Sequence, residues 1–284
     1  MSLVVLALVL FAALAHAAWN LLAKQAAGGS VFVWLAASAG ALIYLPAFAV
    51  SVASTRNQLD LAAIGLMSGS GVLHAAYFVL LQRGYSTGEL SLVYPLARGT
   101  GPLLSVALAI AFLGERPSAL AIAGASIIVA AVFSLARGGR AANRNREAIG
   151  FALLTGATIA AYTLWDKHAV GPDRLSPIAY YWGANLVNVA LLTPWALSRR
   201  ELVRTAWATS WREAAGVGLL SPLAYILVLY ALARAPVSYV APARETSILI
   251  ATVLGATVLG ETDPRRKLVC AALMVLGVVA LAVG

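Results

Sequence analysis

A succession of long apolar segments constrains this chain more than any other feature of its sequence. Ten stretches are almost free of charge, and each has about the 20 residues that an α-helix needs to cross a bilayer. The predicted helices span residues 3–23, 31–53, 61–82, 90–112, 118–136, 148–167, 177–197, 213–233, 237–259 and 266–283. Lipid admits only helices or closed barrels, and these segments lack the alternating polarity of barrel strands. The sequence therefore predicts an all-α, multi-pass membrane protein with ten transmembrane helices.

The polar residues are too few to cover a soluble fold of this length. Of the 284 residues, 61% are hydrophobic and 11% are charged, whereas about 25% of the residues in a soluble domain are charged. The net charge of +9 comes from basic residues that lie mostly between apolar segments, and neither a basic helix nor a stacking platform for bases is present. We therefore expect membrane lipid, and no nucleic acid, as a partner.

The two halves of the chain resemble one another. The tripeptide Leu-Gly-Glu occurs at residues 113–115, after the fourth apolar segment, and again at residues 259–261, after the ninth. The offset that aligns these tripeptides also aligns Arg98 with Arg244. A motif that recurs together with a charged residue at the same spacing indicates an internal repeat.

The repeat predicts an inversion, because each half holds five helices. An odd number of crossings makes the second half enter the membrane in the opposite direction to the first. We expect one five-helix repeat over residues 1–140 and a second over residues 146–284. Inverted repeats of this kind occur in many secondary transporters, which bind their substrate near the middle of the membrane between the two halves.

Ten helices in two groups of five, each group carrying Leu-Gly-Glu before its last helix, resemble the EamA-like branch of the drug/metabolite transporter superfamily. The resemblance covers the whole chain and implies a secondary transporter that works by alternating access in a bacterial cytoplasmic (inner) membrane. Members of the superfamily carry amino acids, nucleotide sugars, triose phosphates or drugs. The resemblance therefore implies transport more firmly than it implies a substrate.

Two arginines interrupt the apolar segments at equivalent positions. Arg98 and Arg244 each lie about a third of the way into a predicted helix, where a charge costs about 2.5–3.5 kcal/mol or more unless it faces a cavity or a partner. Guanidinium groups from both halves could bind a carboxylate or phosphate of the substrate. Alternatively, Arg244 pairs with Glu245, and Arg98 caps a broken helix or extends to the interface. We expect Arg98 to be the stronger anion ligand, because Glu245 is next to Arg244.

Polar and aromatic side chains recur on one face of several predicted helices. His16, Trp19 and Asn20 have the i, i+3, i+4 spacing of neighbours on a helix surface, and Tyr162 and Asp166 have comparable spacing in the sixth segment. Such faces are better suited to lining a binding site than to contacting lipid. The candidate substrate-binding residues are Arg98, Arg244, Trp19, Asn20, Tyr77, His74, His16, Tyr94 and Tyr162.

These residues favour a carrier that exports a small anionic or zwitterionic metabolite, such as an amino acid. The alternative function is a flippase of a lipid-linked substrate, whose basic residues should lie at the level of the lipid headgroups. Arg98 lies deeper than that, which favours the carrier. A proton is the candidate coupling ion, because His16 and His74 lie inside predicted helices and histidine titrates near neutral pH.

Other chemistry is not indicated by the sequence. No paired carboxylates or nucleophile-base motif predicts an enzyme, and no phosphate-binding loop predicts the use of ATP. The three histidines lack the spacing of metal ligands, so we expect no metal and no other cofactor. Cys270 is the only cysteine, which excludes a disulfide within the chain.

Overall fold

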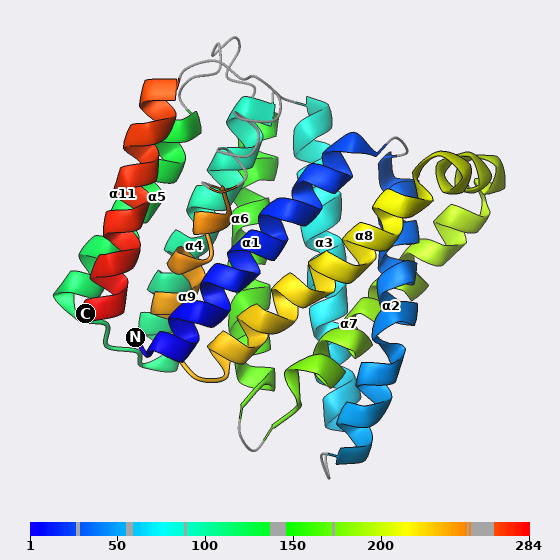
Figure 1. The fold of residues 1–284 in the computed structure, drawn as a ribbon, viewed down its shortest axis with the longest axis horizontal. Helices are drawn as coiled ribbons and strands as arrows, with labels where there is room; N and C mark the ends of the chain where they lie inside the picture. Colours follow the sequence, from blue (N-terminus) through cyan, green and yellow to red (C-terminus); the bar gives the residue numbers. More distant parts are fainter. Residues whose placement is uncertain are drawn as a thin grey trace.

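The computed structural model describes residues 1–26, 29–54, 59–87, 90–136, 146–171, 174–248, 250 and 264–284. In this part of the chain it has ten helices and no strand, which confirms the all-α prediction (Figure 1). The helices are α1 (Leu3–Gln25), α2 (Gly29–Ser54), α3 (Leu61–Thr87), α4 (Leu90–Leu113), α5 (Ala119–Ala136), α6 (Arg146–Ala169), α7 (Pro177–Leu197), α8 (Arg200–Leu232), α9 (Val237–Ala243) and α11 (Pro264–Val283).

The outer surface of the bundle is apolar. Large side chains such as those of Leu61, Phe112 and Val283 are 85%, 77% and 76% exposed, respectively. Within the described residues, six helices are long and apolar enough to cross a membrane by length and composition, namely α1, α2, α3, α4, α6 and α8. A surface of this kind is compatible with lipid and not with water, so the protein is an integral membrane protein that crosses the bilayer several times.

The helices pack in a set of close pairs (Figure 1). α1 lies along α8, α5 lies along α11, and α6 packs against both α3 and α4. Glycines allow the closest approaches, because a side chain on Gly218 of α8 would clash with the backbone of Gly40 on α2. Gly124 of α5 and Gly277 of α11 meet in the same way. Small residues at helix contacts are typical of membrane bundles, in which packing replaces the hydrophobic effect.

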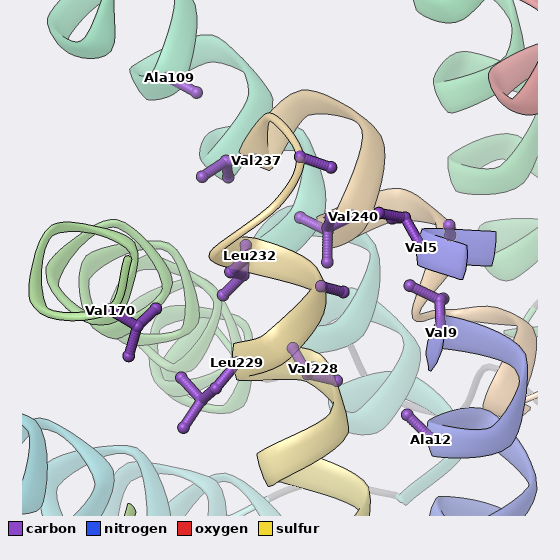
Figure 2. Close-up of a cluster of buried hydrophobic side chains, with 14 of the residues drawn as sticks. Val5, Val9, Ala12, Ala109, Val170, Val228, Leu229, Leu232, Val237 and Val240 are labelled. Atoms are coloured by element: carbon purple, nitrogen blue, oxygen red, sulfur yellow. The ribbon is translucent and has the colours of Figure 1, made fainter. Parts of the chain in front are cut away.

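The main hydrophobic core joins the first helix to the last third of the chain. Figure 2 shows side chains from α1, α8 and α9 meeting in this cluster, with contributions from α4 and the end of α6. The labelled residues are Val5, Val9, Ala12, Ala109, Val170, Val228, Leu229, Leu232, Val237 and Val240. Val237 and Val240, which belong to α9, therefore fix the start of this helix in the core.

Helix α8 differs from the prediction at its N-terminal end. The segment was expected over residues 213–233 after a polar connector, but α8 already begins at Arg200 and bends at Ser210 (φ −140°, ψ 25°). The added turns are amphipathic, since Ala206 and Ser210 are buried while Trp207 and Trp211 are 56% and 47% exposed. Exposed tryptophans beside arginines are typical of the membrane interface, which explains why a polar stretch forms a helix here.

The ninth predicted segment, residues 237–259, is also not continuous. α9 ends at Ala243, Arg244 and Glu245 form a turn, and helical structure resumes at Thr246. Across this turn the backbone bonds span three residues, as from the Glu245 N–H to the Pro242 oxygen (3.0 Å). Pro242 lies inside α9 and lacks an amide hydrogen, so the Ser238 carbonyl has no N–H partner at this position of the helix. Residues 251–259 lie outside the described part of the chain.

Candidate functional site

The break after α9 places two charged side chains opposite a third one on α4. Arg98, Arg244 and Glu245 are 5%, 4% and 1% exposed, so all three are buried. The Arg98 Nε lies 3.0 Å from Glu245 Oε2, and the Arg244 Nε lies 3.7 Å from Glu245 Oε1. The two arginines that the sequence pattern aligned therefore meet at one carboxylate. We call these three residues the charge cluster.

The charge cluster is not electrically balanced. Two guanidinium groups and one carboxylate leave an excess of one positive charge. Arg98 also donates to the Ser247 hydroxyl through Nη2 (3.5 Å), whereas the buried Arg244 Nη2 has no hydrogen-bond partner among the described residues. The alternative in which Arg244 pairs with Glu245 is present in the structure, but Glu245 has a shorter contact with Arg98. Arg244 is the arginine with donor capacity to spare.

Part of α1 lies beside the charge cluster. His16 is close enough to Arg98 and Arg244 for an electrostatic interaction with both. The rings of His16 and Trp19 make an edge contact with centroids 4.8 Å apart, and the buried Trp19 Nε1 has no hydrogen-bond partner among the described residues. Asn20 donates to the His16 carbonyl of its own helix (2.7 Å). The Asn20 side-chain amide therefore donates within its own helix, whereas the Trp19 indole N–H does not.

An aromatic cluster adjoins the other side of Arg244. The Arg244 guanidinium carbon lies 5.9 Å from the centroid of the Tyr162 ring, a cation-π arrangement. The Tyr162 ring stacks on His74 (4.2 Å) and makes an edge contact with Tyr77 (6.0 Å). Tyr225 of α8 contacts both His74 and Tyr162. Three predicted residues from two helices, His74 and Tyr77 of α3 and Tyr162 of α6, therefore meet beside Arg244.

A buried carboxylate lies next to the aromatic cluster. Asp166 is 0% exposed, and its Oδ1 accepts a hydrogen bond from the Tyr180 hydroxyl of α7 (2.7 Å). Its Oδ2 accepts a hydrogen bond from the Tyr225 hydroxyl of α8. The sequence pattern grouped Asp166 with Tyr162 but could not identify Tyr180, or the bond from Tyr225, because both tyrosines lie on other helices. Tyr94 belongs to α4, but its side chain lies outside the described part of the structure.

Two charged residues fix the start of α9 and hence the position of Arg244. Glu115 accepts hydrogen bonds from the backbone amides of Val237 (2.7 Å) and Ser238 (2.9 Å). These are N–H groups that the first turn of a helix leaves without partners. Lys167 donates to the carbonyl oxygens of Leu232 (2.5 Å) and Ala235 (3.0 Å) in the preceding connection. Glu115 is therefore a structural cap of α9.

The arrangement offers charge and aromatic surface but no ligand set for a metal. Within the described ranges, no three His, Cys, Asp or Glu side chains lie together as a metal site would require. A guanidinium group with a free N–H, an indole N–H and several aromatic rings can together bind an anionic group and the organic part that carries it.

Comparisons with known proteins give one family and one fold. The model of the EamA-like transporter family matches residues 146–283. No curated protein matches the chain. A solved structure described as "Crystal structure of protein" has 18% sequence identity and a TM-score of 0.78, over 98% of this chain and 96% of that one. At this identity the likeness concerns the fold alone, and it extends over nearly all of both chains.

Proposed function

We propose, from the premise that this chain belongs to the EamA-like transporter family, that it is a secondary carrier of a small metabolite that bears a carboxylate. The family is part of the drug/metabolite transporter superfamily, and its members are membrane transporters and not enzymes. The substrate in this proposal is anionic or zwitterionic, such as an amino acid. Export across a bacterial cytoplasmic membrane by alternating access completes the proposal.

The observation that carries this proposal is the unbalanced charge of the buried cluster. A buried guanidinium donor without a partner costs about 1–3 kcal/mol or more, and the Arg244 Nη2 is such a donor among the described residues. A substrate carboxylate would accept this N–H and neutralise the excess charge. Aromatic side chains beside Arg244 would then contact the organic part of the same molecule.

The packing of the helices supports an inverted repeat as the framework for this site. α1 packs on α8 as α6 packs on α3, and α2 packs on α8 as α7 packs on α3. An exchange of residues 1–140 with residues 146–284 would produce this correspondence. The pairs α2–α7, α4–α9 and α5–α11 would then lie across the two-fold axis. An interrupted helix with a charged residue at the break is also typical of carrier sites near the membrane midplane.

The burial of the two arginines favours a carrier of small metabolites over a flippase of a lipid-linked substrate. A flippase must admit a lipid headgroup from the side, so its basic residues should be accessible from the outer surface of the bundle. Arg98 and Arg244 are at most 5% exposed, and both contact the Glu245 carboxylate inside the bundle. This position suits a ligand that is enclosed between the halves.

Exchange in liposomes tests the proposal. Purified protein would be reconstituted and offered radiolabelled amino acids, monocarboxylates and phosphorylated compounds, with exchange against the same unlabelled compound as the measurement. We expect exchange of a compound with one carboxylate and little exchange of dianionic phosphates, since the site has one excess positive charge. A fluorescent-lipid scrambling assay on the same liposomes is the control. Lipid scrambling without exchange of any carboxylate would contradict the carrier and support the flippase.

A further inference from the structure

Asp166 is a second buried charge whose surroundings the anion site does not explain. Its carboxylate lies within the membrane-spanning helix α6 and is fully enclosed. Within the described residues it forms no ion pair, and both of its oxygens accept hydrogen bonds from tyrosine hydroxyls. Lys167 follows it directly in the chain, but the Lys167 ammonium group donates to two backbone carbonyls instead.

The groups that face this carboxylate come from every helix packed around it. α7 and α8 contribute Tyr180 and Tyr225, and α3 contributes His74, whose ring lies 5.2 Å from that of Tyr225. α6 itself contributes Tyr162 and Lys167. Beyond Tyr162 lies the charge cluster of Arg98, Arg244 and Glu245. The His74 Nδ1 is bonded to the Ser70 backbone oxygen (2.9 Å).

The hydrogen bonds of Asp166 depend on its protonation state. An ionised carboxylate only accepts hydrogen bonds, so both tyrosines can donate to it at once. A protonated carboxyl group has a hydroxyl that must itself donate, so one tyrosine has to rotate or withdraw. Since the two tyrosines lie on α7 and α8, proton binding changes how these helices are joined to α6. The proton also removes a charge whose burial in the membrane is costly.

We propose that the carboxyl group of Asp166 binds and releases the proton that is coupled to substrate movement. This inference rests on the proposed carrier function and gives it a coupling site other than His16 and His74. Asp166 is distinguished from both histidines because its protonation alters direct contacts between three helices. The tyrosine hydroxyls are the positioning groups, because both donate to its carboxylate oxygens.

The same geometry links the proton to the anion. Tyr225 contacts Tyr162 (ring centroids 6.1 Å apart), and Tyr162 lies under Arg244. An ionised Asp166, which lies beyond Tyr162 from the charge cluster, lowers the positive electrostatic potential there without changing the cluster's own charge, and a proton on Asp166 removes this effect. A proton on Asp166 therefore strengthens anion binding, and by linkage a bound anion strengthens proton binding to the same degree. Proton and metabolite then move in the same direction, so export occurs when the outward gradient of the metabolite exceeds the opposing gradient of protons.

Infrared spectroscopy tests the site without requiring transport. Wild-type protein in lipid nanodiscs would be titrated with acid, and the carbonyl stretch of a protonated carboxyl group would be followed. We expect a titrating band in the wild type and in the control variant Asp60→Asn, whose carboxylate is exposed at the start of α3. The band should be absent from Asp166→Asn. The proposal would be overturned if Asp166→Asn showed the same titrating band as the wild type. It would also be overturned if the wild type showed no titrating band.

A second variant keeps the test valid if Asp166→Asn does not fold. Tyr225→Phe retains the carboxyl group and removes one hydroxyl that stabilises its ionised form. The midpoint of the infrared titration should therefore move to higher pH. Tyr230→Phe, a tyrosine of the same helix that contacts Arg234 instead, is the matched control and should leave the midpoint in place. A midpoint that stays fixed in Tyr225→Phe counts against the proposal.

Transport under a pH gradient then tests the coupling. With the compound that exchanges fastest in the liposome panel, accumulation would be compared with and without a pH gradient. The ratio of accumulation with the pH gradient to accumulation without it should be well above one for the wild type and for Asp60→Asn. It should fall to one for Asp166→Asn. A wild-type ratio in Asp166→Asn would overturn the coupling. Failure of the carrier proposal would look different, since wild-type protein would move no compound while the infrared band still titrated.

Discussion

Among single residues, Glu245 has the largest influence on what the site can bind. It is shared between Arg98 and Arg244, and it sets the charge of the cluster at one positive unit instead of two. A buried pair of this kind contributes little net stability, but removal of one partner leaves the other charge uncompensated. The effect of each substitution should therefore follow the total charge of the cluster more closely than the identity of any one contact.

A charge-balanced double substitution tests this interpretation. Arg98→Gln leaves Arg244 and Glu245 to neutralise each other, so exchange should fall roughly tenfold or more, as expected when a charged hydrogen bond worth about 1.5–3 kcal/mol is lost. Adding Glu245→Gln restores one positive charge on Arg244. We expect the double variant to recover a substantial part of the exchange per folded molecule. If the double variant is as inactive as Arg98→Gln alone, total charge does not control binding.

The residue types at the site were evident from the sequence, whereas their partners were not. Arg98 and Arg244 stood out because charge inside an apolar segment is costly, and Trp19, His74 and Tyr162 stood out by helical spacing. The closer pairing of Glu245 with Arg98 could not be predicted, because adjacency in the chain favoured Arg244. Tyr180 was missed, and the bond from Tyr225 to Asp166 could not be predicted, for a related reason, since nothing local to either tyrosine indicates a carboxylate on another helix.

At the scale of the helix, the short α9 shows how an interruption positions a side chain. Pro46, Pro194 and Pro222 all lie inside helices that continue past them, so a proline alone does not predict a break. α9 ends because Pro242 is followed by a turn whose two charged residues are held in the charge cluster. The tertiary contact therefore decides which proline ends a helix, and tertiary contacts are what a sequence pattern lacks.

The cap on α9 gives a prediction at this scale. Glu115→Gln keeps one acceptor oxygen but loses the negative charge and one of the two bonds to the amides of Val237 and Ser238. The loss should destabilise the protein by about 1–2 kcal/mol, as for other helix caps, and lower its melting temperature in detergent. Glu201→Gln is the control, since the Glu201 side chain is 87% exposed. Equal melting temperatures for the two variants would show that the cap adds no stability.

The whole molecule was largely predictable in its class and less so in its geometry. The apolar segments gave the helices because crossing a bilayer fixes both length and composition. The extension of α8 to Arg200 was not predicted, since an interfacial helix needs only an apolar stripe and carries charges that suggest a loop. The order in which helices pack also needs contacts that lie far apart in sequence, such as those between α1 and α8.

Residues 1 and 284 lie near each other at one end of the bundle (Figure 1). The Met1 amino group donates to the Ala282 carbonyl oxygen (2.7 Å), so the start of α1 touches the end of α11. A short glycine-serine linker can therefore join residue 284 to residue 1, and the chain can be reopened in the connector at residues 137–145. Such a circular permutant begins with the second half of the chain.

We expect the permutant to insert, to melt within a few degrees of the wild type, and to retain exchange, because circular permutation is tolerated where the ends adjoin. Degradation of the permutant, while a protein cut at the same connector and expressed as two pieces stays active, would show that the order of synthesis matters. If the permutant folds and retains exchange, neither folding nor exchange depends on the order of the two halves in the chain. Either half could then be made first.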